Sequence, residues 1–393
     1  MIGAGDISTV YLNAIHRSPA LELGAIAARD PGKLTAIAAR YDAPSRTVRE
    51  LLADPAIELI LNLTPATMHR EINEAIVAAG KHVYSEKPFT LSRASAERLS
   101  RQAEAHGTLV GAAPDTFYGS AHQAVRRALD QGLIGAPLFG TSFLGLPGLE
   151  MFHPDPAAFY RPGGEPPFDM GPYYIAMWVN LLGPVRQVFA TSGRGRTIRS
   201  VKRGPRAGTE FAVEVDTSFS TLLRFENATV TLILSLDVVV PTLRPGDLYG
   251  ANGMMQFADP MFFSGEPRIQ LADGAPRGLD TTDLPFATHN RRDHVARPVA
   301  DYRGVGLTDL AIAIRTGSQH RTTPDLVVHT VEVMEAITAS ARTHRPVDLL
   351  TSCARPAPLN ADRDALLVAL AASPFDFDCA APHADDAHAP TTR

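Results

Sequence analysis

The chain has 393 residues, of which 45% are hydrophobic and 20% are charged, which is ordinary for a folded protein of about two domains. Its 37 Lys and Arg against 42 Asp and Glu give a net charge of -5. These values exclude a disordered or fibrous protein and argue against nucleic acid or an anionic membrane as partner.

Hydropathy and cysteine content exclude further classes of protein. The most apolar strand-like run, residues 229–240, is interrupted by Ser235 and Asp237 and is shorter than the roughly 18 residues of a membrane span. Cys353 and Cys379 lie outside any metal-ligand spacing, so neither a disulfide framework nor a cysteine zinc site is predicted. We expect a cytoplasmic protein without a signal peptide or a bound metal.

The chain begins with a glycine-rich turn before an expected helix at residues 7–16. Gly3, Gly5 and Ser8 fit the pattern G-x-G-x-x-S, in which glycines let backbone N–H groups approach a pyrophosphate and the small third residue packs closely. The predicted cradle comprises Gly3, Gly5, Asp6, Ile7 and Ser8. Taken alone, the motif is also compatible with a flexible chain start.

Only Met1 and Ile2 precede this motif, although such a turn follows a complete strand. In a doubly wound sheet that strand is central, so its loss would remove ladder hydrogen bonds of about 1 kcal/mol each. We therefore expect a truncated first strand and a natural start several codons upstream. A native N-terminus at Met1 would contradict this.

Residues 1–117 alternate short apolar runs with helical periodicity, the pattern of βαβ units and a parallel sheet. The expected strands are residues 21–27, 57–63, 82–84 and 108–112, and the expected helices after the first are residues 67–79 and 92–106. We predict a dinucleotide-binding α/β domain here.

The end of the second expected strand bears on cofactor choice. Ala28 stands where an acidic residue would bind the ribose of NAD, and Arg29 follows it, which slightly favours NADP over NAD. The alternative, in which Arg29 is a solvated turn residue and Asp30 caps the next helix, is equally compatible with the sequence.

Two later strands end in chemically useful residues, and ligands bind at this edge of open α/β sheets. Glu86 and Lys87 precede Pro88, and Lys87 is one of only four lysines in the chain. Thr64 and His69 follow the preceding strand. The alternatives are a surface ion pair for Glu86 and Lys87 and a structural role for His69.

A second group of candidate catalytic residues lies in and after a Gly- and Pro-rich loop. Asp169 and Tyr173 are four residues apart at the start of an expected helix, so they can share one face. Asp169 could instead be an N-cap and Tyr173 a core aromatic. The loop upstream supplies three candidate substrate contacts, which could equally be loop packing: His153, Tyr160 and Arg161.

The remaining chain indicates a second, α+β domain over residues 118–358, with long alternating strands. Hairpins are predicted for residues 217–236, through Glu226 and Asn227, and for residues 247–257, through Asn252 and Gly253. Helices are expected at residues 307–316 and 326–343. We predict that the Pro-, Ala- and Asp-rich residues 359–393 are peripheral or disordered.

Taken together, the motifs resemble the Gfo/Idh/MocA family of glucose-fructose oxidoreductase and inositol dehydrogenase relatives, over residues 1–358. The resemblance implies a Rossmann domain and a C-terminal domain whose large, mostly antiparallel open sheet builds a homodimer or homotetramer. It implies that Glu86 contacts the cofactor ribose and that Lys87 lies beside the nicotinamide and substrate. The matching stretch after the earlier strand comprises Asn62, Leu63, Thr64, Pro65 and His69, of which we assign Thr64, Pro65 and His69 to the cofactor site.

The same resemblance places Asp169 and Tyr173 at the reacting carbon. Three positions depart from the family pattern: many relatives have His at Tyr173, Asp at Ala176 and Gly at Glu165. The glucose-fructose oxidoreductase branch has Tyr at the position of Tyr173.

We therefore expect an NAD(P)-dependent oxidoreductase acting on a sugar, inositol or related polyol. Tyr173 would take the hydroxyl proton, Lys87 would favour its phenolate and stabilise developing alkoxide, and Asp169 would orient Lys87 or the substrate. The alternative is a non-catalytic NAD(P)- or sugar-binding sensor of the same fold.

Overall fold

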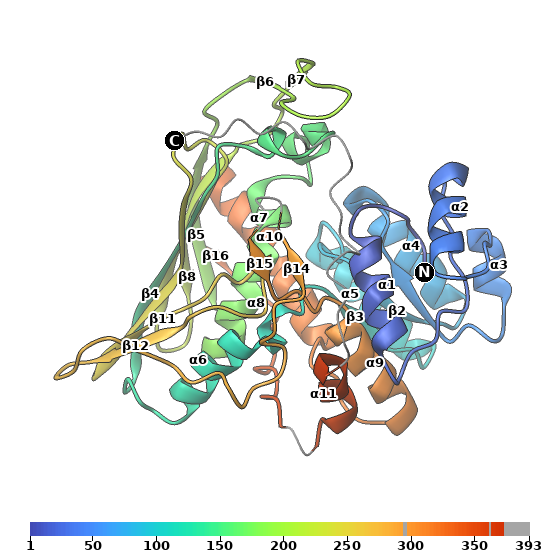
Figure 1. Cartoon of the computed structure of the whole chain (residues 1–393). Helices are drawn as coiled ribbons and strands as arrows, with labels where there is room; N and C mark the ends of the chain where they lie inside the picture. Colours follow the sequence, from blue (N-terminus) through green and yellow to red (C-terminus); the bar gives the residue numbers. More distant parts are fainter. Residues whose placement is uncertain (294–296, 361–362, 373–393) are drawn as a thin grey trace.

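The computed structural model describes residues 1–293, 297–360 and 363–372, which form two lobes (Figure 1). Cys379 and the rest of residues 373–393, on which part of the tail prediction falls, lie outside this range. Within it, no helix is both long and apolar enough to span a membrane.

The N-terminal lobe is a parallel sheet flanked by helices, as its alternating pattern predicts. Its strands run in the order β1-β2-β3: β1 (Leu59–Asn62), β2 (His82–Ser85) and β3 (Val110–Ala112). Its helices are α1 (Ser8–Arg17), α2 (Pro31–Arg40), α3 (Val48–Ala53), α4 (Ala66–Ala78) and α5 (Arg93–Ala105). Because the strands are parallel, their carboxyl ends meet at one edge of the sheet.

The opening residues complete this sheet as a very short central strand. Ile2 pairs in parallel with both Asn62 and Ala27, and both of its backbone groups are bonded, to the carbonyl of Leu61 and the N–H of Leu63. The expected strand at residues 21–27 is correspondingly short, since only Ile26 and Ala27 form bridges. The central position predicted for the first strand is therefore observed.

The second lobe is built on a nine-stranded sheet in the order β13-β12-β11-β10-β4-β9-β8-β5-β16. Its strands are β4 (Pro137–Gly145), β5 (Gln187–Gly193), β8 (Ser218–Arg224), β9 (Thr229–Ser235), β10 (Thr242–Gly250), β11 (Gly253–Gln256), β12 (Arg268–Leu271), β13 (Arg277–Gly278) and β16 (Val347–Asp348). All neighbours are antiparallel except β4 and β9. Both predicted hairpins are confirmed, as β8–β9 and β10–β11.

Helices cover the face of this sheet that is turned toward the N-terminal lobe (Figure 1). They are α6 (Ser120–Asp130), α8 (Gly171–Leu182) and α10 (Pro324–Thr343). Nearly all residues of α8 are buried, and most are apolar, as is typical of a helix enclosed by its neighbours. The Trp178 indole donates to Ser142 Oγ on β4. A buried helix therefore carries Tyr173.

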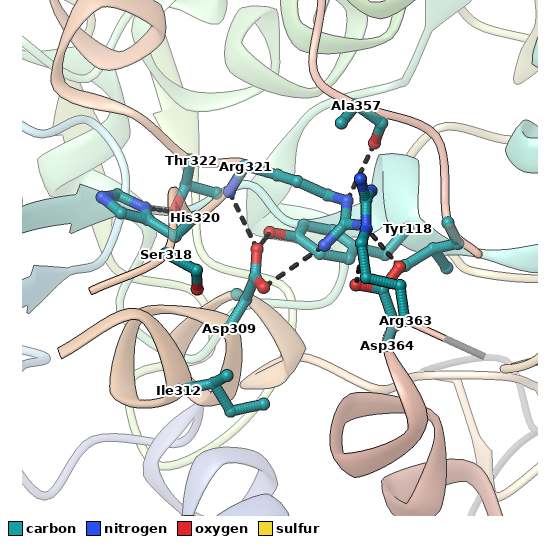
Figure 2. A network of polar contacts seen from close by, with 12 residues as sticks. Tyr118, Asp309, Ile312, Ser318, His320, Arg321, Thr322, Ala357, Arg363 and Asp364 are labelled. Carbon is teal, nitrogen blue, oxygen red and sulfur yellow. Dashed lines mark hydrogen bonds and ion pairs between the residues drawn. The ribbon is translucent and has the colours of Figure 1, made fainter. Parts of the chain in front are cut away.

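The C-terminal segment is tied into the first lobe by a buried arginine. Figure 2 shows Arg321 bonded to the carboxylates of Asp309, on α9 (Val305–Thr316), and Asp364, which precedes α11 (Ala365–Ala372). The Tyr118 hydroxyl donates to the same Asp309 carboxylate. Broken by truncation, this network would leave buried charges unpaired.

The described part of the predicted tail is therefore not a loose extension. α11 packs on α9 and buries Leu367 and Leu370, each contributing roughly 1.5–3 kcal/mol. Of the two alternatives expected from residue 359, disordered or peripheral, disorder is excluded for residues 365–372, where an apolar helix packs on α9.

A buried histidine on α10 makes the stability of the fold pH-dependent. His329 Nε2 accepts a hydrogen bond from the Val185 N–H, so this nitrogen must stay unprotonated. Burial lowers the pKa of His329 from 6.5 to about 4. The neutral imidazole thus contributes stability that is complete above pH 6.5 and is lost as the pH falls toward 4, about 3 kcal/mol in total.

We predict that His329→Gln reduces the slope of unfolding free energy against pH between 6.5 and 4 by about one proton. Urea unfolding at a series of pH values measures the slope. His106→Gln, at an exposed position, is the matched control and should leave the slope unchanged. An identical slope in His329→Gln and the wild-type protein would contradict the prediction.

Candidate active site

The centre of the site is an ion pair between residues 82 positions apart. Lys87 follows β2, and Asp169 ends the short helix α7 (Pro166–Asp169) directly before α8. Lys87 Nζ donates to the backbone carbonyl oxygen of Asp169 at 2.6 Å and to its Oδ1 at 2.7 Å, and both side chains are 14% exposed. The two lobes therefore meet through a half-buried ion pair at the carboxyl end of β2.

Tyr173 lies one helical turn beyond Asp169, with two cations around its ring. Lys87 Nζ is 5.2 Å from the ring centroid, and Arg303 Cζ is 5.7 Å from it. Arg303 Nη2 donates to the Tyr173 hydroxyl at 3.5 Å. Lys87 thus faces the ring of Tyr173 and directs its hydrogen bonds to Asp169.

Arg303 is a residue that the sequence reasoning missed. It lies in the segment between β15 (Pro298–Val299) and α9, and its guanidinium also bonds Asp301 and the Met261 carbonyl. No motif marks this position in the sequence. Only the following Gly304, with φ +103, signals that the chain turns sharply there.

The electrostatics keep Lys87 in its charged form. Burial has the largest effect and lowers the pKa of Lys87, but the charges of Asp169, Tyr173 and Glu86 together outweigh it, so the pKa is raised overall. An ammonium held in this way cannot accept a proton at neutral pH. Lys87 can therefore act as a hydrogen-bond donor and positive charge, and the base must be another group.

Glu86 supports the site from within the first lobe. The Tyr11 hydroxyl of α1 donates to Glu86 Oε1 at 2.8 Å, and the Lys87 N–H donates to Oε2 at 2.9 Å. The carboxylate is buried and joins the glycine-turn helix to the Lys87 segment. Contact of Glu86 with a ribose stays a prediction.

The glycine turn combines one tightly packed and one open position. Gly3 has φ +108, and a Cβ there would lie 2.5 Å from the carbonyl oxygen of Leu63. A Cβ on Gly5 would meet no atom within 4 Å. Ser8 is buried, as the small third position requires, and the first turn of α1 has no side-chain cap. The turn formed by Gly3, Asp6 and their neighbours therefore leaves space before α1, at a helix start that no side chain caps.

The residues after β1 have a supporting role in this structure. His69 is buried, and its ring nitrogens lie 2.6 Å from the Thr64 carbonyl oxygen and 2.7 Å from that of Pro88. Both nitrogens face backbone carbonyl oxygens, so His69 links the loop of Thr64 and Pro65 to the Lys87 segment. Contact of His69 with a cofactor stays a prediction.

The turn after Ala27 agrees with the structural alternative for Asp30, whose carboxylate caps α2 by accepting from the Lys33 N–H. Arg29 is exposed beside it and is therefore accessible. Its contact with a 2'-phosphate stays a prediction.

The three candidate substrate contacts of the upstream loop bond to groups other than Lys87 and Asp169. Tyr160 is fully buried, its hydroxyl donating to Glu150 and accepting from the Leu149 N–H, so its assignment as a substrate contact is wrong. His153 Nδ1 accepts from the Asp155 N–H, and the exposed Arg161 pairs with Glu214 at 3.4 Å. These two side chains are engaged with their own loop and with the nearby Glu214.

Glu165, the departure noted in the loop, folds back on its own turn. Its Oε2 accepts from the Gly163 N–H at 2.6 Å, and burial raises its pKa. It thus stabilises the turn before α7. Across the described ranges, no group of three or more His, Cys, Asp or Glu residues could hold a metal ion.

Comparison with known proteins gives matches over most of the chain. Residues 1–113 match the profile described as "Oxidoreductase family, NAD-binding Rossmann fold" (GFO/IDH/MocA), and residues 122–256 match the "GFO/IDH/MocA C-terminal domain". The chain is 30% identical over 306 residues to a dTDP-3,4-didehydro-2,6-dideoxy-alpha-D-glucose 3-reductase of Saccharopolyspora spinosa, covering 75% of this chain and 84% of that one.

Two further relatives extend the comparison. The uncharacterized oxidoreductase YdgJ of Escherichia coli is 28% identical over 192 residues, which cover 47% of this chain and 53% of YdgJ. A levoglucosan dehydrogenase, solved in complex with NADH and L-sorbose, superposes with a TM-score of 0.76 at 19% identity, covering 89% of this chain and 98% of the other. The two-domain fold expected from the sequence is thereby confirmed.

Proposed function

Because the chain belongs to the GFO/IDH/MocA family of oxidoreductases, we propose that it is an NAD(P)-dependent dehydrogenase or reductase of a sugar, inositol or related polyol. The observation that carries this proposal is the Lys87–Asp169 pair beside Tyr173, at the edge where the strands of an NAD-binding fold end. The dTDP-sugar reductase among the relatives adds nucleotide-linked deoxysugars to the candidate substrates.

The residues at the glycine turn fit a dinucleotide. The open space at Gly5 admits a pyrophosphate close to the backbone, and the uncapped N–H groups of α1 favour its negative charge. Gly3, Gly5, Asp6, Ile7 and Ser8 would hold this part, with Thr64, Pro65 and Glu86 nearer the nicotinamide. A bound nicotinamide supplies the acceptor for a hydride from the substrate carbon, or the donor in the reverse direction. The accessible Arg29 slightly favours NADP.

Three side chains, those of Tyr173, Lys87 and Asp169, would carry out the proton transfer and stabilise the developing charge. In alcohol oxidation the Tyr173 phenolate takes the hydroxyl proton and becomes a neutral phenol as the C–O bond becomes a carbonyl. The Lys87 ammonium donates a hydrogen bond to the substrate oxygen and stabilises the charge that develops on it. Asp169 holds Lys87 in place through the 2.7 Å contact. In reduction the Tyr173 phenol returns the proton to the alkoxide.

Exposed apolar residues on the outer face of the large sheet support self-association. They include Phe139 on β4, Phe189 on β5 and Leu222 on β8, which are 49%, 37% and 45% exposed. We propose that copies of the chain associate through this face into a homodimer or homotetramer, because such apolar patches mark interfaces.

Absorbance of reduced nicotinamide, followed with NAD or NADP and a panel of sugars, inositols and a nucleotide-linked deoxysugar, tests the function. We expect turnover with at least one polyol or sugar. Cofactor binding without turnover on any of them would support the non-catalytic sensor instead.

The open position at Gly5 leads to a prediction about cofactor binding. Gly5→Val places a side chain where the pyrophosphate would lie, and its Cβ meets no protein atom within 4 Å, so we expect at least a roughly 10-fold loss of NADP affinity and little change in melting temperature. Gly3→Ala is the contrasting variant: its Cβ would meet the Leu63 backbone, so it should lower the melting temperature. Calorimetric titration with NADP and thermal unfolding measure both effects. Unchanged NADP affinity in Gly5→Val would contradict this placement of the cofactor.

A further inference from the structure

Arg303 donates a hydrogen bond to the Tyr173 hydroxyl, a contact that the mechanism expected from the sequence does not include. That mechanism gives Lys87 the task of favouring the phenolate of Tyr173. In the structure Lys87 directs its hydrogen bonds to Asp169, whereas Arg303 Nη2 is 3.5 Å from the Tyr173 oxygen. A cation at this distance stabilises a phenolate more than a neutral phenol.

We propose that Arg303 is a positioning residue of the site, which orients the Tyr173 hydroxyl and stabilises its phenolate. This inference rests on the proposed function for its catalytic meaning. It assigns the two cations different tasks: Lys87 acts on the substrate oxygen, and Arg303 acts on the base.

The guanidinium is held by groups on both sides. Its Nη1 donates to Asp301, and its Nη2 also donates to the Met261 carbonyl at 2.9 Å. Asp301 is itself buried and also pairs with Arg291, at 2.7 Å. The short Arg303 segment is therefore braced within the second lobe, which limits how far the guanidinium can move.

The same segment is anchored to the first lobe. The N–H groups of Gly304 and Gly306 both donate to Asp115 Oδ2 at 2.9 Å, and Asp115 follows β3. A Cβ on Gly304 would lie 2.7 Å from the Cβ of Ala14 on α1. Arg303 thus reaches Tyr173 from a segment fixed to the dinucleotide-binding lobe.

Other charged groups face this pair and enter the pH dependence. Asp301, Glu86, Asp115 and Asp259 all interact electrostatically with Arg303, and Lys87 interacts with Tyr173. Burial raises the pKa of Asp115 and Asp259 to about 6, so both titrate near neutral pH, where turnover would be measured. An activity profile alone would mix their titration with that of Tyr173, and a direct optical measurement of the tyrosine is needed.

The experiment is a tyrosinate absorbance titration of the full chain without substrate, compared among the wild-type protein, Arg303→Met and Arg303→Lys, with Tyr173→Phe as the blank. The ionisation that is missing in Tyr173→Phe is expected to move to higher pH by about one unit in Arg303→Met, because a neighbouring positive charge is lost. Arg303→Lys keeps the charge and should restore part of the shift.

Arg126→Met is the matched control, since Arg126 is a buried arginine bonded to Asn180, at the other end of α8. It should leave the Tyr173 midpoint unchanged even if it lowers the melting temperature. An unchanged midpoint in Arg303→Met, or an equal shift in Arg126→Met, would overturn the assignment.

Turnover measured on the same proteins separates the two proposals. We expect kcat of Arg303→Met to fall by roughly 10-fold at neutral pH with little change in KM, and to recover as the pH rises. If the wild-type protein turns over no substrate but the midpoint still shifts, the proposed function fails, while the electrostatic part of this inference stands. Normal wild-type turnover with an unshifted midpoint would refute only the role of Arg303.

Discussion

Replacing Lys87 with methionine is expected to lower kcat/KM by about 10³-fold or more, equivalent to about 4 kcal/mol of transition-state stabilisation. Methionine has a similar length but carries no charge and no donor, so the developing alkoxide would lose its electrostatic partner. The measurement is steady-state turnover with saturating cofactor, using a substrate found with the wild-type protein.

The effect of Lys87→Met must be separated from loss of the fold. The variant leaves the half-buried Asp169 without its cation, which should cost roughly 1–3 kcal/mol of stability, less than global unfolding requires. Lys202→Met removes an exposed lysine and serves as the control, with no expected effect on turnover or stability. Turnover retained by a folded Lys87→Met protein would refute the role of Lys87.

Tyr173→Phe is the second substitution from which we expect a large loss of turnover. The ring keeps its contacts with Lys87 and Arg303 while the proton acceptor is lost, so kcat is expected to fall by about 10²–10⁴-fold and cofactor affinity to stay near that of the wild-type protein. Steady-state kinetics and a cofactor titration measure the two quantities.

The adjacent Tyr174 supplies a matched control on the same helix. Its buried hydroxyl has no hydrogen-bond partner within the described residues, so Tyr174→Phe should leave turnover unchanged and should not reduce stability. A rate in Tyr173→Phe equal to that in Tyr174→Phe would mean that another group takes the proton.

The parts of the fold that the sequence predicts well are those with strong local periodicity. The hairpin of β8 and β9 and the helices α4 and α10 follow from alternating or helical patterns that bury one face. The tail helix α11 was missed because the segment is rich in Ala, Pro and Asp, a composition that hides the short run bearing Leu367 and Leu370.

The candidate site was predictable where a residue lies at a strand end or in a family motif. The strand-end rule and the resemblance together suggested that Lys87 and Asp169 meet, and they form the ion pair observed. Arg303 could not be found in this way, because it is 130 residues from Tyr173 and no local pattern reports that contact. Tyr160 was misassigned because a loop aromatic carries no sequence signal of its burial.

The distances from a bound substrate oxygen to Lys87 Nζ and Tyr173 Oη, measured in a crystal structure of the complex with NADP and a substrate sugar, test the central claim most directly. We predict that one substrate hydroxyl lies within about 3.2 Å of both atoms, with its carbon facing the nicotinamide. A sugar bound with its reacting hydroxyl out of reach of Lys87 and Tyr173 would contradict the account.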